Sequence, residues 1–256
     1  MIFSEQSDIT LVVTSCGRFD LLKRTLASFD ACNTLPLRAA LITEDSGDEA
    51  VRTCIPAHWA GHVTFFVNNP RLGQLRSIDL AYGEIKTAWV FHCEDDWEFY
   101  RPGFIEDSLK LLQAQPKALQ VWLRSAAHDL ALHSPYVSHG ERQIVAGVPC
   151  YRVYSSKADW QGFSFNPGLR RLADYWQHAP YSQFDGEKDL SRLYADEGRY
   201  ALILENDAVM HTGWGGHVAI PHEHERRKKI KRRQHQKIMA ALVLGIVAGL
   251  ILGGIF

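Results

Sequence analysis

The sequence predicts an α/β protein with a mixed, mainly parallel sheet flanked by helices, followed by a C-terminal transmembrane helix. Three observations support this prediction. Short β-rich apolar runs alternate with segments whose apolar residues have helical spacing, which is the pattern of parallel α/β sheets. Polar and acidic residues follow directly on several of these runs, where such sheets bind ligands. The last nineteen residues, 238–256, contain no charged or strongly polar side chain.

The predicted elements follow one another in a regular order. Residues 8–18 begin with an apolar strand, and the next segment, FDLLKRTLASFD, spaces its apolar residues at helical intervals. Further strands are predicted at 37–49, 62–70, 87–94 and 118–124, and helices at 73–85 and 104–113. Beyond residue 125 the pattern is less regular, with strands at CYRVY and YALILEN and a helix start near residue 187; we expect GFSFNPG (162–168) to form part of the acceptor side.

The composition is that of a globular protein. The chain has 256 residues, 46% hydrophobic and 22% charged, enough for one sizeable domain with a buried core. It has five cysteines, which form no C-x-x-C pair: Cys16, Cys32, Cys54, Cys93 and Cys150. Because this number is odd and no signal-peptide pattern is found, we expect a reduced, cytosolic setting.

Charge is distributed unevenly along the chain. Residues 226–237 contain eight Lys or Arg and no acid, which leaves twenty basic against twenty-nine acidic residues elsewhere. An acidic body argues against nucleic-acid binding. As a helix, 238–256 would be about 28 Å long, close to the roughly 30 Å hydrocarbon core of a bilayer.

The basic segment before this helix predicts which side of the membrane the body occupies. Basic flanks favour the cytoplasmic side and contact with anionic lipid. We therefore expect a single-pass C-terminal anchor in a cell inner membrane, with the body in the cytoplasm. Gly245, Gly249 and Gly253 are spaced by four and would give a homodimer interface, although small residues in a tail anchor explain the spacing equally well.

The polar residues at the strand ends are the candidate ligand-binding groups. They are Thr14, Ser15 and Arg18 after the first strand, Glu44 and Asp45 after the second, and Glu94, Asp95 and Asp96 after the fourth. Three adjacent carboxylates beside a buried strand repel one another unless a cation compensates them. Mg²⁺ and Mn²⁺ prefer oxygen ligands, so the cluster predicts a divalent metal with a bound diphosphate; a solvated acidic turn is the alternative.

Two common nucleotide-binding motifs are absent from the sequence. No G-x-G-x-x-G follows the first strand, and no G-x-x-x-x-G-K-[ST] occurs, which argues against a dinucleotide-binding fold and a P-loop NTPase. Instead, TSCGRFDLLKRTLASF, EDSGD, NNPRLGQLRSIDLAYGEI and EDDWEFYRPGF occur in an order and spacing that resembles the family 2 glycosyltransferases and their GT-A relatives. The resemblance covers about residues 8–110.

The resemblance implies a nucleotide sugar across the first strand ends and a Mn²⁺ or Mg²⁺ cofactor. The E-D-D sequence matches the family's D-x-D element, which implies Asp96 as metal ligand and places Glu94 and Asp95 with the nucleotide sugar. Thr14, Ser15 and Arg18 match the loop that embraces the nucleotide. Asp45 matches the acid that contacts the base, with Glu44 as its neighbour.

One part of the chain departs from the family pattern. Where the family usually has Ala-Arg-Asn after a glycine, this chain has Ser77-Ile78-Asp79 after Gly73. We keep Asp79 as a nucleotide-sugar-binding candidate at that position and take Arg76 as the substitute partner of the diphosphate. Simple surface roles remain the alternative for these residues.

The second half should supply the base and the acceptor site. An inverting transfer needs a carboxylate that takes the proton of the acceptor hydroxyl, and DGEKDLSRLY resembles the family's acidic element with Asp185, Glu187 and Asp189. Between the two leading candidates we favour Asp189 over Glu187, with helix capping as the alternative role.

Two further candidates come from the C-terminal part of this half. The resemblance implies a metal-binding histidine in HTGWGGHV, with His211 favoured over His217. Trp160 and Phe163 would stack on an acceptor sugar or pack in the core.

Together these features predict a metal-dependent, inverting glycosyltransferase of the hexosyl- or N-acetylhexosaminyltransferase class. Its acceptor would be a glycan or a lipid-linked molecule at the cytosolic membrane face, in bacterial surface polysaccharide or lipopolysaccharide synthesis. A nucleotidyltransferase and a catalytically silent, membrane-tethered binding module are the alternatives. The predicted domains are 1–222, divided into a donor half (1–115) and an acceptor half (116–222), then the basic segment 223–237 and the membrane helix 238–256.

Overall fold

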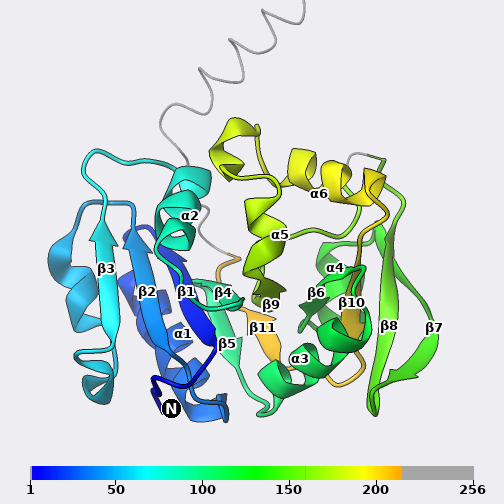
Figure 1. Ribbon diagram of the computed structural model, residues 1–256, viewed down its shortest axis with the longest axis horizontal. Helices are drawn as coiled ribbons and strands as arrows, with labels where there is room; N and C mark the ends of the chain where they lie inside the picture. The colour runs from blue at the N-terminus through cyan, green and yellow to red at the C-terminus, as the bar shows by residue number, and fades with distance from the viewer. Residues whose placement is uncertain (1, 159, 215–256) are drawn as a thin grey trace, which may run out of the picture. The chain divides into compact units, whose positions relative to one another are not determined.

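A five-stranded sheet in the order β3-β2-β1-β4-β9 forms the centre of the N-terminal half (Figure 1). The computed structural model describes residues 2–158 and 160–214, which belong to one compact unit, Met1–Gly215. Its parallel strands are β1 (Ile9–Ser15), β2 (Ala39–Glu44), β3 (Val63–Val67) and β4 (Trp89–Glu94), and β9 (Gly168–Arg171) lies antiparallel beside β4. The prediction of a mixed, mainly parallel sheet is confirmed for this part of the chain.

Helices pack against both faces of this sheet. They are α1 (Phe19–Cys32), α2 (Gln74–Gly83) and α3 (Phe104–Ala114). Leu11 of β1 shares an apolar cluster with Leu22 and Phe29 of α1, whereas the next residue, Val12, shares one with Ile78 of α2. Because successive strand residues point to opposite faces, α1 and α2 must cover opposite sides of the sheet, as Figure 1 shows.

A second, four-stranded sheet in the order β6-β10-β8-β7 forms the other half. Its strands are β6 (Ala118–Trp122), β7 (Val137–Val145), β8 (Val148–Ser155) and β10 (Tyr200–Leu204). The two-residue turn between β7 and β8, Ala146–Gly147, has positive φ at both positions, which suits the twist of a hairpin. The helices here are α4 (Ala131–His133), α5 (Leu172–Trp176) and α6 (Glu187–Asp196). Short helical turns occupy Glu49–Thr53, Ala57–Trp59 and Tyr181–Gln183, and a single π-helical turn occupies Ala126–Leu130.

A short antiparallel ribbon joins the segment after β4 to the C-terminal end of the described chain. Strand β5 (Trp97–Phe99) pairs with β11 (Val209–His211), with Trp97 opposite His211. The backbone N–H of Thr212 continues this pairing by donating to the carbonyl of Asp96 at 2.8 Å. The ribbon therefore places residues 211–213 beside the acidic cluster that ends β4.

The order of the sheet brings the predicted strand-end residues together. Strand β1 lies between β2 and β4, so the chain leaves β1 toward one side of the sheet and returns with β4 on the other. Such a switch in strand order opens a crevice at the carboxyl ends of the strands. In register, Thr14 lies opposite Glu94, and Ser15 lies opposite Glu44.

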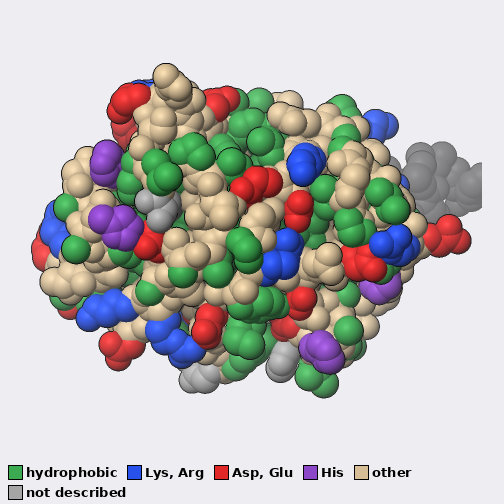
Figure 2. Space-filling model, turned by 90° about the horizontal axis from the view of Figure 1, so that it is seen from below, with side chains coloured by type: hydrophobic (Ala, Val, Ile, Leu, Met, Phe, Trp, Pro, Cys, Tyr) green, Lys and Arg blue, Asp and Glu red, His purple; other side chains and the backbone are tan. Residues whose placement is uncertain are grey.

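Most predicted elements up to residue 124 are found within a few residues of their expected positions, whereas β5, β7 and β9 were not predicted. No helix among the described residues is long and apolar enough to cross a membrane. The predicted anchor 238–256, its glycines and the basic segment 223–237 lie outside those residues. All five cysteines are free thiols. On the face shown in Figure 2, acidic and basic side chains are interspersed.

Candidate active site

Arg18 and the carboxylates of Asp95 and Asp96 form the centre of the site at the β1–β4 crevice. The Nη1 atom of Arg18 lies 2.7 Å from Oδ2 of Asp96, and its Nη2 atom pairs with Oδ1 of Asp95. Both carboxylates are buried, whereas about a quarter of the Arg18 side chain is exposed. One guanidinium therefore offsets much of the repulsion between two adjacent acids.

These contacts set the pKa values of the two aspartates in opposite directions. Burial raises the pKa of Asp95 to about 6, although Arg18 favours its charged form. Burial also opposes ionisation of Asp96, but a hydrogen bond from His211 and the charge of Arg18 outweigh it and lower the pKa of this carboxyl. Asp96 is thus the member of the cluster that is held most firmly as a carboxylate.

His211 and Gly213 complete the surroundings of Asp96. Nε2 of His211 lies 3.1 Å from Oδ2 of Asp96, and the imidazole packs against Trp97 with ring centroids 4.9 Å apart. Nδ1 of His211 is buried and has no hydrogen-bond partner among the described residues. A Cβ atom at position 213 would lie only 2.2 Å from Oδ2 of Asp96, so only glycine allows the backbone this close.

The pair formed by Asp96 and His211 fits a divalent ion as a partial ligand set. Two ligand atoms that share a Mg²⁺ ion at about 2.1 Å in octahedral geometry lie about 3 Å apart, close to the 3.1 Å observed between Oδ2 and Nε2. Among the residues that the structure describes, no group of three or more His, Cys, Asp or Glu could hold a metal. The remaining ligands would have to be water and diphosphate oxygens, and Arg18 competes with an ion for Oδ2 of Asp96.

Glu94 links the acidic cluster to the second half of the protein. Gln74 at the start of α2 donates to it at 3.0 Å. Burial, followed by the charges of Asp96 and Glu187, raises the pKa of Glu94 to about 8. The charge of Glu187 at the start of α6 therefore disfavours ionisation of Glu94.

The predicted nucleotide-loop residues lie together at the crevice, and two of the acids there hold loops in place. Glu44 is fully buried and accepts hydrogen bonds from the backbone N–H groups of Gly17 at 2.9 Å and Ser46 at 2.7 Å. Asp45 accepts from Leu72 N at 2.7 Å and from Gly73 N at 2.9 Å. Thr14 and Ser15 are buried, and Oγ of Ser15 has no partner among the described residues.

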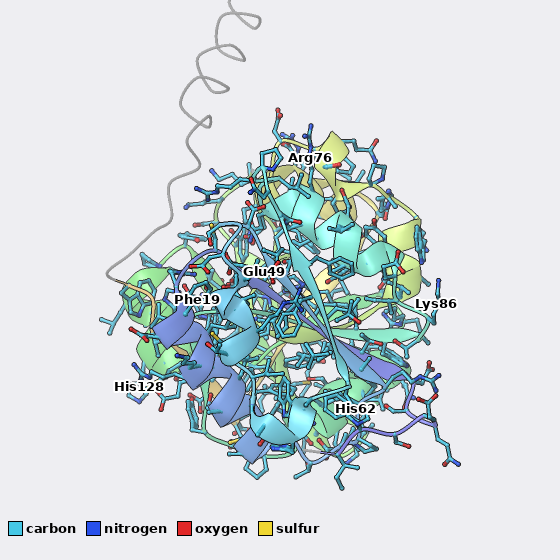
Figure 3. All side chains as sticks on the ribbon, turned by 90° about the vertical axis from the view of Figure 1, so that its left-hand side faces the viewer. Phe19, Glu49, His62, Arg76, Lys86 and His128 are labelled. Carbon is cyan, nitrogen blue, oxygen red and sulfur yellow. The ribbon has the colours of Figure 1, made fainter. Side chains whose placement is uncertain are left out.

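The two candidates on α2 lie apart from this cluster. Asp79 accepts from the backbone N–H groups of Tyr181 at 2.7 Å and Ser182 at 2.8 Å and from the Tyr175 hydroxyl at 3.1 Å, so both of its oxygens hold the segment after α5. This geometry gives Asp79 a structural role in place of the expected nucleotide contact. Arg76 is exposed and lies at the outer edge of the molecule in Figure 3.

Arg71, which the sequence argument did not single out, is the arginine that lies beside Asp45. Its Nε lies 3.8 Å from Oδ2 of Asp45, within the loop that leads from β3 to α2. Arg71, three residues before α2, and Gln74, the first residue of α2, both lie in the segment NNPRLGQ, and this proximity to the helix start was the available signal.

The acidic residues at the start of α6 differ sharply in their surroundings. Glu187 accepts from Phe165 N at 2.9 Å, from the Trp160 indole at 3.2 Å and from the Ser164 hydroxyl at 3.3 Å. Asp189 accepts from Arg192 at 3.0 Å and from the backbone N–H of Asp185 at 3.2 Å, as a residue that supports a helix start does. The structure therefore favours Glu187 over Asp189 as the candidate base, which reverses the order of preference drawn from the sequence.

The environment of Glu187 also favours a proton-accepting role. Burial raises the pKa of Glu187, while the hydrogen bonds it accepts and the charge of Arg170 act in the opposite direction. Arg170 is itself buried, and its guanidinium donates to the carbonyl groups of Ser164 and Asn166, on either side of the Phe165 amide that binds Glu187. No sequence motif marked Arg170.

The remaining sequence candidates are divided between the wall of a pocket and the core. Trp160 lines a pocket that also contains Glu187, whereas Phe163 packs in the apolar cluster around α2 and α6. His217 lies outside the described residues.

Comparisons with known proteins show what this fold is similar to. No protein-family model matches the sequence, and no curated protein matches it. Three solved structures are similar at 11–15% identity over 80–82% of this chain: the mannosyltransferase PcManGT from Pyrobaculum calidifontis in complex with GDP-Man and Mn²⁺ (15%, TM-score 0.60), S. aureus TarS 1–349 (11%, 0.56), and GalNAc-T7 with UDP, GalNAc and Mn²⁺ (13%, 0.58).

These similarities have a defined extent. The chain spans 58%, 60% and 44% of those three solved chains, respectively. At identities this low, the likeness concerns the arrangement of helices and strands. Residues 2–158 and 160–214 therefore have the mixed α/β fold called GT-A, on which these transferases are built.

Proposed function

We propose that this protein is a divalent-metal-dependent, inverting glycosyltransferase that moves a sugar from a nucleotide sugar to a hydroxyl acceptor. The observation that carries the proposal is the Asp96–His211 pair, 3.1 Å apart at the switch in strand order. The fold supports it, and so do two similar structures, which are complexes with GDP-Man and Mn²⁺ and with UDP, GalNAc and Mn²⁺.

The chain's own residues would bind the donor at the crevice between β1 and β4. Thr14, Ser15 and the loop held by Glu44 would contact the nucleotide, and Arg18 and Arg71 would attract the diphosphate by charge. Asp96 and His211 would hold the ion, which when bound would neutralise the charge of the diphosphate leaving group. Glu94 and Asp95 would complete the wall beside the donor.

Glu187 would act as the general base. As the acceptor oxygen bonds to the anomeric carbon and the bond to the diphosphate breaks, the hydroxyl proton would pass to a carboxylate oxygen of Glu187. Attack from the face opposite the leaving group inverts the anomeric configuration. The hydrogen bonds from Phe165, Trp160 and Ser164 fix the carboxylate for this transfer.

One observation favours a second candidate, a binding module without turnover. Arg18 pairs with both Asp95 and Asp96 and so provides a cation for the acidic cluster without any metal. A protein in which this arrangement persisted would bind a nucleotide without needing Mn²⁺ and would transfer nothing.

A transfer and hydrolysis assay with UDP-, GDP-, CMP- and dTDP-sugars, in the presence of Mn²⁺ or of EDTA, distinguishes the glycosyltransferase from the binding module. We expect one donor to be consumed only with the metal, and Asp96→Asn to lose about 100-fold or more in rate. Glu187→Gln should lose about 100-fold to 10,000-fold, while the matched change Asp189→Asn on the same helix stays within about twofold of wild type. Full activity in EDTA, or retention of anomeric configuration by NMR, would overturn the mechanism.

The proposal also includes a membrane location, which depends on residues outside the described part of the chain. A lipid-linked or membrane-held acceptor, the inner-membrane anchor and a role in surface-polysaccharide synthesis rest on residues 226–256 of the sequence. Removal of 238–256 should yield a soluble protein that still binds the nucleotide; an insoluble truncation would contradict the anchor.

A further inference from the structure

A pocket of about 250 Å³ in the second half of the protein has a lining unlike the donor crevice. Its aromatic members are Trp122, Tyr136 and Trp160, with the Trp160 ring centroid 5.4 Å from that of Trp122 and 5.7 Å from that of Tyr136. Aromatic rings with polar groups between them suit the apolar and hydroxylated faces of a sugar. Ser164 and Asn166 supply such polar groups.

This pocket shares a residue with the candidate active site. Glu187, the candidate base, lies in its wall. Arg124, also in its wall, lies with its guanidinium 5.4 Å from the centroid of the Trp97 ring, the ring against which His211 packs. A ligand in the pocket would therefore lie beside the carboxylate of Glu187.

The charge of the lining is the unexpected feature. Among the described residues that line the pocket, Arg124, Lys157 and Lys188 are basic and only Glu187 is acidic, in a body where acidic residues outnumber basic ones. Arg124 is held by Asp129 through hydrogen bonds of 2.6 and 2.8 Å. Lys157 instead lies with its amine 3.4 Å from the centroid of the Tyr136 ring, and within the described chain it has no carboxylate partner.

We propose that the pocket binds an acceptor sugar that carries an anionic group, a phosphate or a carboxylate, which Lys157 and Lys188 hold at the rim. This inference rests on the proposed function, because it assigns the acceptor of the same reaction. Lysine ammonium groups act as mobile point charges that suit phosphate oxygens, and the ring of Tyr136 keeps the Lys157 amine over the pocket. The aromatic walls hold the sugar ring and Glu187 receives the proton of its hydroxyl.

The test measures the binding of three small probes, glucose, glucose 1-phosphate and glucuronate, to the full-length protein. Binding is measured by titration calorimetry and by the quenching of tryptophan fluorescence. Both anions, or one of them, should bind at least tenfold more tightly than glucose, and the better of the two identifies the group. The preference should weaken as salt is raised, because charge attraction is screened.

Matched lysine variants make the assignment specific. The double variant Lys157→Gln/Lys188→Gln should bind the anions no better than glucose, whereas Lys86→Gln, an exposed lysine labelled in Figure 3 in the loop between α2 and β4, should behave like wild type. Equal binding of glucose and both anions, no binding of any probe, or an unchanged anion preference in the double variant would overturn the proposal. Failure of the proposed function would show separately, as no Mn²⁺-dependent binding of any nucleotide sugar by the wild-type protein.

Discussion

Replacing Gly213 with alanine adds a single methyl group beside Asp96 and so tests the geometry of the proposed metal-binding pair, Asp96 and His211. A Cβ atom at this position would lie 2.2 Å from Oδ2, 2.7 Å from Cβ and 2.8 Å from Cγ of Asp96. Gly213 is not among the glycines with positive φ, so alanine meets no backbone strain there. The whole effect of the substitution therefore comes from the collision with Asp96.

The size of the effect follows from these distances. Contacts below 3.0 Å are not sustained, so the Asp96 oxygen must retreat by about 0.8 Å from the new methyl group. A displacement near 1 Å in a reacting group reduces rates about 100-fold, and crowding a packed site costs roughly 1–3 kcal/mol of stability. We expect Mn²⁺ affinity to fall at least tenfold and donor turnover about 100-fold in a protein that still folds.

The assay is the titration of free Mn²⁺ by electron paramagnetic resonance, well below the unfolding temperature. Gly83→Ala is the matched control, because its added methyl group at the end of α2 would meet no atom within 4 Å. Wild-type Mn²⁺ affinity in Gly213→Ala would show that Asp96 is not the ligand, and the reasoning would fail.

Three further predictions concern charged groups of the site. Arg18→Gln should lower stability by about 3 kcal/mol, because it leaves two buried carboxylates without their cation, and Mn²⁺ should then stabilise this variant more than wild type. Arg24→Gln, which breaks an exposed pair between α1 and Glu98 of β5, should change stability by less than about 1 kcal/mol. An equal Mn²⁺ response in both variants would contradict us. Burial raises the pKa of Glu187 above 4.5 in the folded protein. The free energy of unfolding of wild type relative to Glu187→Gln should therefore fall as pH rises from about 4.5 through the folded pKa. A difference between the two proteins that stays constant or rises with pH in urea unfolding would refute this. Arg170→Met should move the rising limb of the pH–rate profile to higher pH by roughly half a unit to one unit, since the Arg170 charge lowers the pKa of Glu187, whereas Arg192→Met should not move it.

The sequence was a good guide to structure wherever local pattern decides it. The strand and helix from Ile9 to Cys32 follow from a run of apolar residues and then from helical spacing, both of which depend only on near neighbours. The carboxylates of Asp95 and Asp96 were found for a similar reason, since strand ends can be located from sequence. Their meeting with Thr14 then follows from the parallel order of β1 and β4.

What the sequence could not give is the partner of each charged group. Asp189 and Glu187 lie two residues apart at one helix start, and only the packing of residues 160–165 shows that Glu187 accepts from the Phe165 amide while Asp189 pairs with Arg192. Asp79 likewise binds backbone groups at 181 and 182, about a hundred positions away, which no local motif records. The cation for Asp95 and Asp96 was expected from solution, yet the fold already supplies one from Arg18.

The ribbon of β5 and β11 has a consequence for the folding of the protein during its synthesis. Asp96 emerges early, whereas its neighbour His211 is translated more than a hundred residues later and reaches it only through the last described strand. A nascent chain that already holds the whole first sheet up to β4 would still lack the imidazole. The proposed ion-binding pair would thus be complete only after residue 211 has been translated and β11 has paired with β5.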